Sequence, residues 1–161
     1  MPSDCYLKID GVKGESQASD MADNIDLESW SFGATNAASL GGKGLAAGKA
    51  SFADFSFSFS LEACSYQLLK NLAEGTHIKN AVFTGRKTGG KGKPVPYLVI
   101  TMTHCYVTNF STGGGSTGVP SASVTLAYEE IKFEYKTQDT ATGATTTAGT
   151  ATYDIKKVES T

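Results

Sequence analysis

A nucleophilic serine is suggested by the segment GGSTG at positions 114–118, which fits the G-x-S-x-G pattern of serine hydrolases. In such enzymes a strand precedes the serine and a helix follows it, so that the hydroxyl stands on a strained turn. Here Val119 and Pro120 follow, and the next residues alternate as in a strand. We interpret the match as a flexible glycine-rich loop. An esterase that uses Ser116 stays an alternative, which an assay on a generic ester would test.

Phosphate-binding chemistry is suggested by the stretch 42–49, which resembles a P-loop. A P-loop requires Ser or Thr directly after its lysine and a glycine five residues before the glycine of its Gly-Lys pair. The chain has Ala50 and Lys43 at these two positions, and a strand pattern follows instead of a helix. We therefore expect no phosphate site in this segment.

Metal-ligating and redox-active residues are few and far apart. His77 and His104 have no neighbouring Cys, Ser or carboxylate motif, and Cys5, Cys64 and Cys105 form no C-x-x-C pair. Zinc sites and catalytic triads require such groups in recognisable combinations, and three distant cysteines do not make a disulfide framework. We therefore expect no metal, no cofactor and no catalytic residue.

Charge and hydropathy limit the possible partners. The net charge is −2, and the one basic run lies at a predicted turn without interleaved aromatic residues: Arg86, Lys87, Lys91 and Lys93. Nucleic-acid binding requires clustered positive charge, so we expect none. No window of about 18 apolar residues predicts membrane insertion. The start, MPSDCYLKID, lacks the basic and apolar regions of a signal peptide, which predicts synthesis and folding in the cytoplasm.

A strict alternation marks residues 51–62, SFADFSFSFSLE. Phe55, Phe57, Phe59 and Leu61 alternate with small polar residues. Side chains of a strand point to opposite faces with period two, so this segment predicts a strand with one buried face and one face of hydroxyls. An ordinary solvated strand face carries long charged side chains, which are absent here. The hydroxyl face is either a plain wet surface or the lining of a channel, a neighbour or a ligand.

The remaining elements predict a single domain over residues 1–161, mainly β. A helix is expected at about 65–75, with Ser65 as its cap, a stripe of Leu68, Leu69 and Leu72, and Gly75 as its end. Residues 33–49 lack periodicity and predict an extended glycine-rich loop. Alternating apolar residues predict further strands, two of them slipping in phase at Leu27–Trp30 and Glu129–Glu130 as β-bulges do: 5–12, 25–32, 81–86, 97–110, 122–136 and 150–158. Bulged strands favour closure, so we expect an antiparallel β-barrel of two closed sheets with one flanking helix.

An ordered set of segments resembles one family over about residues 4–157. The segments are YLKIDGVKGES, IDLESWSFGAT, AGKASFADFSFS, GTHI, FTGRKTGG, PVPYLVITM, FSTGGG and IKFEYK. In this order they are similar to the haemolysin-coregulated protein family, the tube subunit of the type VI secretion system, which is related in fold to phage tail-tube proteins.

The resemblance implies a non-enzymatic subunit of six-membered rings that stack into a tube inside a contractile sheath. It further implies small effector proteins carried in the ring, contacts with a spike protein and the sheath, and secretion out of the cell or into target cells. It makes Ser31 the candidate contact for cargo in the lumen. For the long loop we expect contacts with a neighbouring subunit, through Ala38, Leu40, Gly41, Gly42, Leu45 and Lys49.

A monomeric β-barrel that binds a ligand or carbohydrate is the alternative from a different class. Carbohydrate binding requires aromatic side chains exposed on one face. Trp30 and most of the phenylalanines fall instead in the phase that we assign to the core. A solution mass equal to that of one chain would favour this alternative.

Overall fold

The computed structural model describes residues 4–42, 44–88, 94–138, 145–156 and 159–160. Within these ranges, eleven strands and one helix follow one another. Their bounds are β1 Asp4–Ile9, β2 Ile25–Asp26, β3 Ser29–Ser31, β4 Ala34–Gly41, β5 Gly44–Phe52, β6 Phe55–Ser60, α1 Cys64–Glu74, β7 Ile78–Thr88, β8 Pro94–Gly113, β9 Ser121–Gln138, β10 Thr145–Asp154 and β11 Glu159–Ser160.

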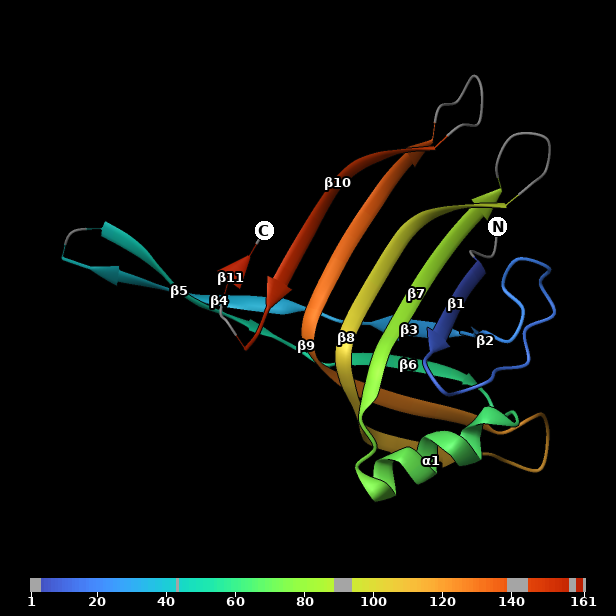
Figure 1. Cartoon of the computed structure of the whole chain (residues 1–161). Coiled ribbons are helices and arrows are strands. Elements are labelled where there is room, and N and C mark those ends of the chain that lie inside the picture. The colour runs from blue at the N-terminus through green and yellow to red at the C-terminus, as the bar shows by residue number, and fades with distance from the viewer. Residues whose placement is uncertain (1–3, 43, 89–93, 139–144, 157–158, 161) are drawn as a thin grey trace.

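Nine strands form a single antiparallel sheet that curls into a half-barrel (Figure 1). Its main path runs β11-β10-β9-β8-β7-β1-β2, and β9 pairs in addition with β6, which pairs with β3. Strands β4 and β5 form a separate two-stranded sheet in the described part of the chain and extend away from the half-barrel (Figure 1). The predicted antiparallel barrel with one flanking helix is confirmed, with one curled sheet supplying both walls.

A sharp bend crosses β7, β8 and β9 at the same level. In each strand the spacing of the buried apolar residues changes from two to three positions at one point: Ile78 to Ala81, Met102 to Cys105, and Tyr128 to Ile131. These residues are partners in the ladders, and the register is the same on both sides of the skip. His104 lies on the bend with a positive φ of 54°. Because all three strands change face together, one sheet turns a corner without losing its pairing.

The bend divides the sheet into two walls. Above it, β9 pairs with β10 as far as Glu130, and the Glu129 carbonyl accepts a hydrogen bond from the Ile155 N–H at 2.7 Å. Below it, β9 pairs with β6 between Leu126 and Ser121. The two long strands, β8 and β9, thus belong to both walls. In the upper wall they lie with β7, β1 and β10, and in the lower wall with β6 and β3.

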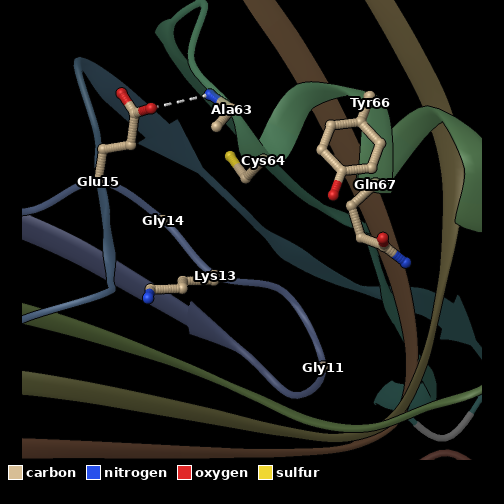
Figure 2. Close-up of a pocket in the computed structure, with 8 residues that line it drawn as sticks. All are labelled: Gly11, Lys13, Gly14, Glu15, Ala63, Cys64, Tyr66 and Gln67. Atoms are coloured by element: carbon tan, nitrogen blue, oxygen red, sulfur yellow. Dashed lines mark hydrogen bonds between the residues drawn. The ribbon is translucent and has the colours of Figure 1, made fainter.

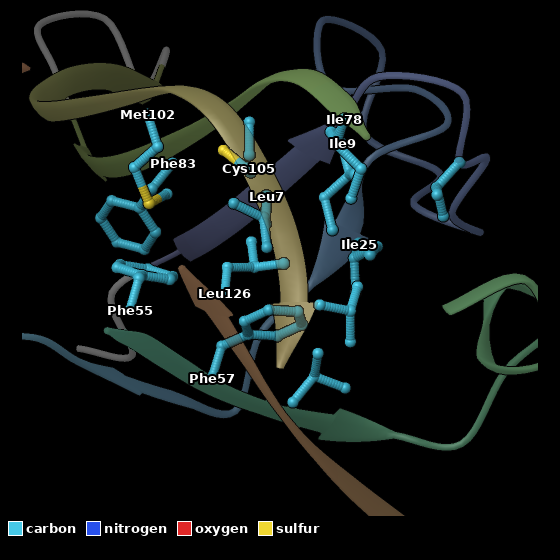
Figure 3. Close-up of a cluster of buried hydrophobic side chains, with 14 of the residues drawn as sticks. Leu7, Ile9, Ile25, Phe55, Phe57, Ile78, Phe83, Met102, Cys105 and Leu126 are labelled. Atoms are coloured by element: carbon cyan, nitrogen blue, oxygen red, sulfur yellow. The ribbon is translucent and has the colours of Figure 1, made fainter. Parts of the chain in front are cut away.

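The core fills the space between the two walls (Figure 3). Phe55, Phe57 and Phe59 of β6 are buried, as their alternation predicts. Phe55 packs against Phe83 of β7, with ring centroids 5.8 Å apart, and Trp30 packs on the same ring at 4.5 Å. Leu61 was expected to continue the buried row, but it lies beyond the end of β6 and is 39% exposed.

The helix α1 covers one end of the half-barrel and contacts β8 (Figure 1). Leu68 is buried and Leu72 half-buried, but Leu69 is exposed, because the buried side of the helix includes Asn71 instead. Gly75 ends the helix with a φ of 65°, as predicted. Ser65 is not its cap: the Ser65 hydroxyl accepts a hydrogen bond from the Glu62 N–H, at 3.2 Å.

Three local predictions are corrected. Residues 25–32 are two short strands, because β2 pairs with β1 whereas β3 pairs with β6. The phase slip at Glu129–Glu130 is the shared bend, with no shift of register in β9. Residues 33–49 are mostly a β-hairpin, because backbone pairing does not require the alternation of apolar side chains that the sequence lacks there.

Truncation of the phenylalanine row tests the core. Phe59→Ala should lower the free energy of unfolding by about 3–5 kcal/mol, since a fully buried ring is lost and a cavity is left. Leu61→Ala, two positions away, is the matched control and should cost about 1 kcal/mol or less, because that side chain is partly solvated. Urea unfolding at one fixed protein concentration measures both. Equal losses would contradict the assigned faces.

Candidate functional site

A surface of small hydroxyl side chains covers the outer face of the lower wall. We call it the hydroxyl wall. Its rows follow from the strand register, in which Ser29 pairs with Ser58, Ser58 with Ser123, and Ser123 with Ser111. The next row joins Ser31, Ser56 and Thr125 in the same manner. Its members come from four adjacent strands: Ser29, Ser31, Ser56, Ser58, Ser60, Ser111, Ser121, Ser123 and Thr125.

Several hydroxyls of this wall are hydrogen-bonded to each other or to a nearby carboxylate. The Oγ atoms of Ser29 and Ser58 are 2.5 Å apart, and Ser60 donates to the Glu28 carboxylate at 2.5 Å. At the rim, Thr108 donates to Asp54 at 3.2 Å. The paired segments contain no lysine or arginine. Such a surface is wet and smooth, and it offers a contacting molecule few fixed charges.

Ser31, the predicted cargo contact, lies on this wall and is exposed. It is at the end of β3, opposite Ser56, and Gly33 separates it from the projecting hairpin. Sequence reasoning found the contributions of β3 and β6 to the wall but missed that of β9. The segment SASVTL at 121–126 shows the same alternation of small polar and apolar residues and was the available signal.

The second candidate surface is the hairpin of β4 and β5. Ala38 pairs with Ala47 and Gly41 with Gly44, and Gly42 lies in the turn. Leu40 and Leu45 are paired in the backbone, and their side chains lie outside the described residues. Lys49 is exposed on β5. The structure therefore places the six predicted contact residues on one projecting element.

Close backbone packing explains a glycine of this hairpin. A Cβ at Gly48 would lie 2.5 Å from the Ala37 carbonyl oxygen, at the place where the register shifts between Asn36 and Ala38. Most of the described side chains of the hairpin are small and exposed. An isolated two-stranded hairpin is marginally stable in water. A surface that packs on this hairpin would therefore stabilise it.

An apolar cleft of about 340 Å³ opens at the base of the hairpin. The Phe52 ring of β5 stacks on Tyr153 of β10, with centroids 4.5 Å apart. Phe32 and Phe133 face each other at 6.1 Å. The cleft thus separates the hairpin base from the outermost long strand of the sheet, and further aromatic or aliphatic side chains would fit in it.

A second cleft, of about 370 Å³, lies between the 11–24 loop and the first turn of α1 (Figure 2). The Glu15 carboxylate accepts a hydrogen bond from the Ala63 N–H at 3.3 Å (Figure 2). Since α1 has no capping side chain of its own, Glu15 supplies a negative charge to the positive end of the helix dipole. The loop therefore stabilises the helix.

Arg86 anchors the same loop from the upper wall. Its side chain is buried, donates to Asp20 at 2.6 Å and to the Tyr6 hydroxyl at 3.1 Å, and lies 4.7 Å from the centre of the Tyr6 ring. The hydrogen bond from Arg86 holds the pKa of Asp20 below its ordinary value of 3.8. Sequence reasoning placed Arg86 in a solvated basic run, and no local signal showed that the loop covers it. Lys91 and Lys93 of that run lie outside the described residues.

The remaining reactive groups do not assemble into a catalytic site. Ser116 lies in an exposed loop that leads into β9, so the strand-turn-helix of a hydrolase is not formed. Cys64 and Cys105 are buried, and burial raises the pKa of the Cys105 thiol to about 12. One prediction is corrected: His77 and His104 are not isolated, because the fold brings His77 Nε2 within 2.8 Å of His104 Nδ1.

Two absences apply to the described part of the chain. Within it, no group of three or more His, Cys, Asp or Glu side chains is arranged to hold a metal ion. Nor does any of its helices have the length and apolar character required to cross a membrane.

Comparisons with known proteins converge on one family. The model of the family "Type VI secretion system effector, Hcp" matches residues 6–135. The chain is 35% identical over 140 residues to the protein hcp1 of Pseudomonas aeruginosa, covering 86% of each chain. It is similar in structure to Hcp1 from Salmonella typhimurium, with a TM-score of 0.82 at 29% identity over the whole of both chains. A type VI secretion effector from Yersinia pestis matches with a TM-score of 0.75 at 26% identity, over 94% of this chain and all of that one.

The ion pair of Arg86 and Asp20 predicts a pH dependence. Because the pKa of Asp20 is lower in the folded than in the unfolded chain, the pair stabilises the fold above the unfolded pKa. This stabilisation is lost as the pH falls through the folded pKa. Asp20→Asn should therefore lower the Tm at pH 7, and the gap to the wild type should close below pH 3.8.

Asp23→Asn is the matched control for that series. Asp23 belongs to the same loop, but its contact with Lys13, at 3.8 Å, joins two exposed side chains. Its substitution should leave the Tm almost unchanged at every pH, as exposed pairs contribute little. A Tm gap for Asp20→Asn that persists unchanged at pH 2 would contradict the role of the ion pair.

Proposed function

The chain belongs to the Hcp family of type VI secretion tube proteins, and from this premise we propose that it assembles as six-membered rings that stack into the inner tube. Hcp proteins are secreted through the type VI system. We propose that this chain leaves the cell in that way and carries small effector proteins in the lumen of the ring. The hydroxyl wall is the observation on which the lumen assignment rests.

The chemistry of the hydroxyl wall suits the lining of a channel. Cargo has to enter the ring, stay during assembly and leave after expulsion. A strongly charged or apolar lining would hinder these steps. Hydroxyls that are already paired, such as Ser29 with Ser58, make weak new contacts. Ser31 is exposed at the end of this wall and is the proposed cargo contact.

The hairpin suits the contact between subunits. Both of its edges are unpaired among the described strands, and an open strand edge is a template for pairing with another chain. Closure of a ring by head-to-tail contacts uses two different patches of each subunit. We propose that the hairpin is one of them and that it reaches the next subunit within a ring or in the stacked ring.

The spike protein and the sheath are the further proposed partners, in keeping with the family. We propose no enzymatic activity, which agrees with the position of Ser116 in a loop without a following helix. The alternative of a monomeric carbohydrate-binding module is not favoured. Trp30, the single tryptophan, is half-buried between Phe55 and Phe83 and presents no open platform for a sugar.

Ring formation is tested by the mass in solution. Light scattering after gel filtration should give six times 16.8 kDa, about 101 kDa. A chain without residues 37–46 should elute as a monomer, because it lacks most of the hairpin, while its circular dichroism should stay β-rich, since the hairpin pairs with no strand of the large sheet. A wild-type monomer at all concentrations would overturn the ring, and a shortened chain that still forms rings would overturn only the role of the hairpin.

Cargo contact is tested with an introduced charge. Ser31→Glu should reduce the amount of a co-expressed small type VI effector that stays on the purified ring, because a carboxylate on the wall has to be desolvated by the cargo. The mass of the ring should not change. Gln17→Glu adds the same charge on the exposed 11–24 loop and should retain the effector. Equal retention by both variants would remove Ser31 from the cargo contact.

A further inference from the structure

The two histidines of the chain meet at the corner of the sheet. His77 lies between the end of α1 and the start of β7. His104 lies on β8, at the bend of the sheet next to α1 (Figure 1). His77 Nε2 is 2.8 Å from His104 Nδ1, and the two ring centroids are 5.0 Å apart. Both residues are exposed, so solutes reach the pair.

The positions of both rings are determined by the fold. His104 adopts a φ of 54°, a left-handed conformation that costs free energy in any residue with a Cβ. The shared bend of β7, β8 and β9 imposes this conformation and thereby sets the direction of the His104 side chain. The Tyr106 ring packs edge-on against His77, with centroids 5.5 Å apart. The pair is therefore partly preorganised, which lowers the ordering cost of binding a ligand.

We propose that His77 and His104 together chelate a divalent transition-metal ion that prefers square or tetragonal geometry, Cu²⁺ or Ni²⁺. Imidazole nitrogens are good ligands for both ions. With metal–nitrogen bonds of about 2.0–2.1 Å, two ligands at a right angle are about 2.9 Å apart, whereas tetrahedral ligands are about 3.3 Å apart. The separation of 2.8 Å agrees with the right angle.

The metal can replace the hydrogen bond between the two rings without changing the number of protons on the protein. In the hydrogen-bonded pair one imidazole donates its N–H to the unprotonated nitrogen of the other. When the metal binds, the donor ring loses the proton from its inner nitrogen and takes one up from water on its outer nitrogen. Rotation of the two rings away from the hydrogen-bonded arrangement would then direct both inner lone pairs to the metal. Because the described residues offer no group of three such ligands, water completes the coordination.

The test is an isothermal calorimetric titration of the untagged chain with NiCl₂. The chain contains two histidines in all, so a double variant has none, which gives a clean baseline. We expect saturable binding of one Ni²⁺ per chain. His77→Gln and His104→Asn should each weaken it by roughly tenfold or more, a loss of about 1.4 kcal/mol. Asn is chosen at 104 because it tolerates the left-handed conformation.

Circular dichroism and ring mass check that each variant keeps its fold. Folded single variants that bind Ni²⁺ as tightly as the wild type would overturn the proposal. So would a wild-type chain without saturable binding, in which case the pair is a structural hydrogen bond only. These outcomes are independent of the tube proposal, which stands on the mass of the ring.

Discussion

The corner that β7, β8 and β9 turn together is the constraint on which the rest of this structure depends. Hydrogen-bonded ladders fix the register of neighbouring strands, so one strand cannot change its buried face alone without losing pairs. Here Ile78, Cys105 and Tyr128 lie at one level, and each strand skips one position beside it. The skip lets two long strands serve both walls. His104 adopts a left-handed conformation at this corner, and this conformation carries part of the strain of the bend.

Along each strand of the lower wall, side chains point alternately to the core and to the outer surface, so one pattern determines both faces. The residues that fill the core, such as Phe57 and Val124, alternate with those that form the hydroxyl wall, such as Ser58 and Ser123. A shift of one residue in either strand would exchange these faces, burying serines and exposing aromatic rings. The burial of the phenylalanines thus holds the hydroxyls in their outward rows, and the stability of the core and the character of the surface have one cause.

The elements outside this sheet differ in how they are held. The 11–24 loop is fastened from two sides, by the buried Arg86 through Asp20 and by Glu15 at the start of α1. Among the described residues of the hairpin, the anchor lies at its base, where Phe52 stacks on Tyr153. A loop with internal anchors keeps its shape in the single chain. A projecting two-stranded hairpin is marginally stable by itself, so contact with a neighbouring subunit, as proposed above, would stabilise it.

The amino-acid sequence by itself determined the class of the fold, the buried faces of most strands and the family. Alternation is a local property, and the ordered segments need no knowledge of contacts. Tertiary structure alone decided the rest. It made a hairpin of 34–52, where no apolar period marks the strands, and it buried Arg86 through a partner 66 positions away. It brought together two histidines that are 27 positions apart. Each of these three features depends on which distant segments become neighbours, and the corner of the sheet determines how the segments are arranged.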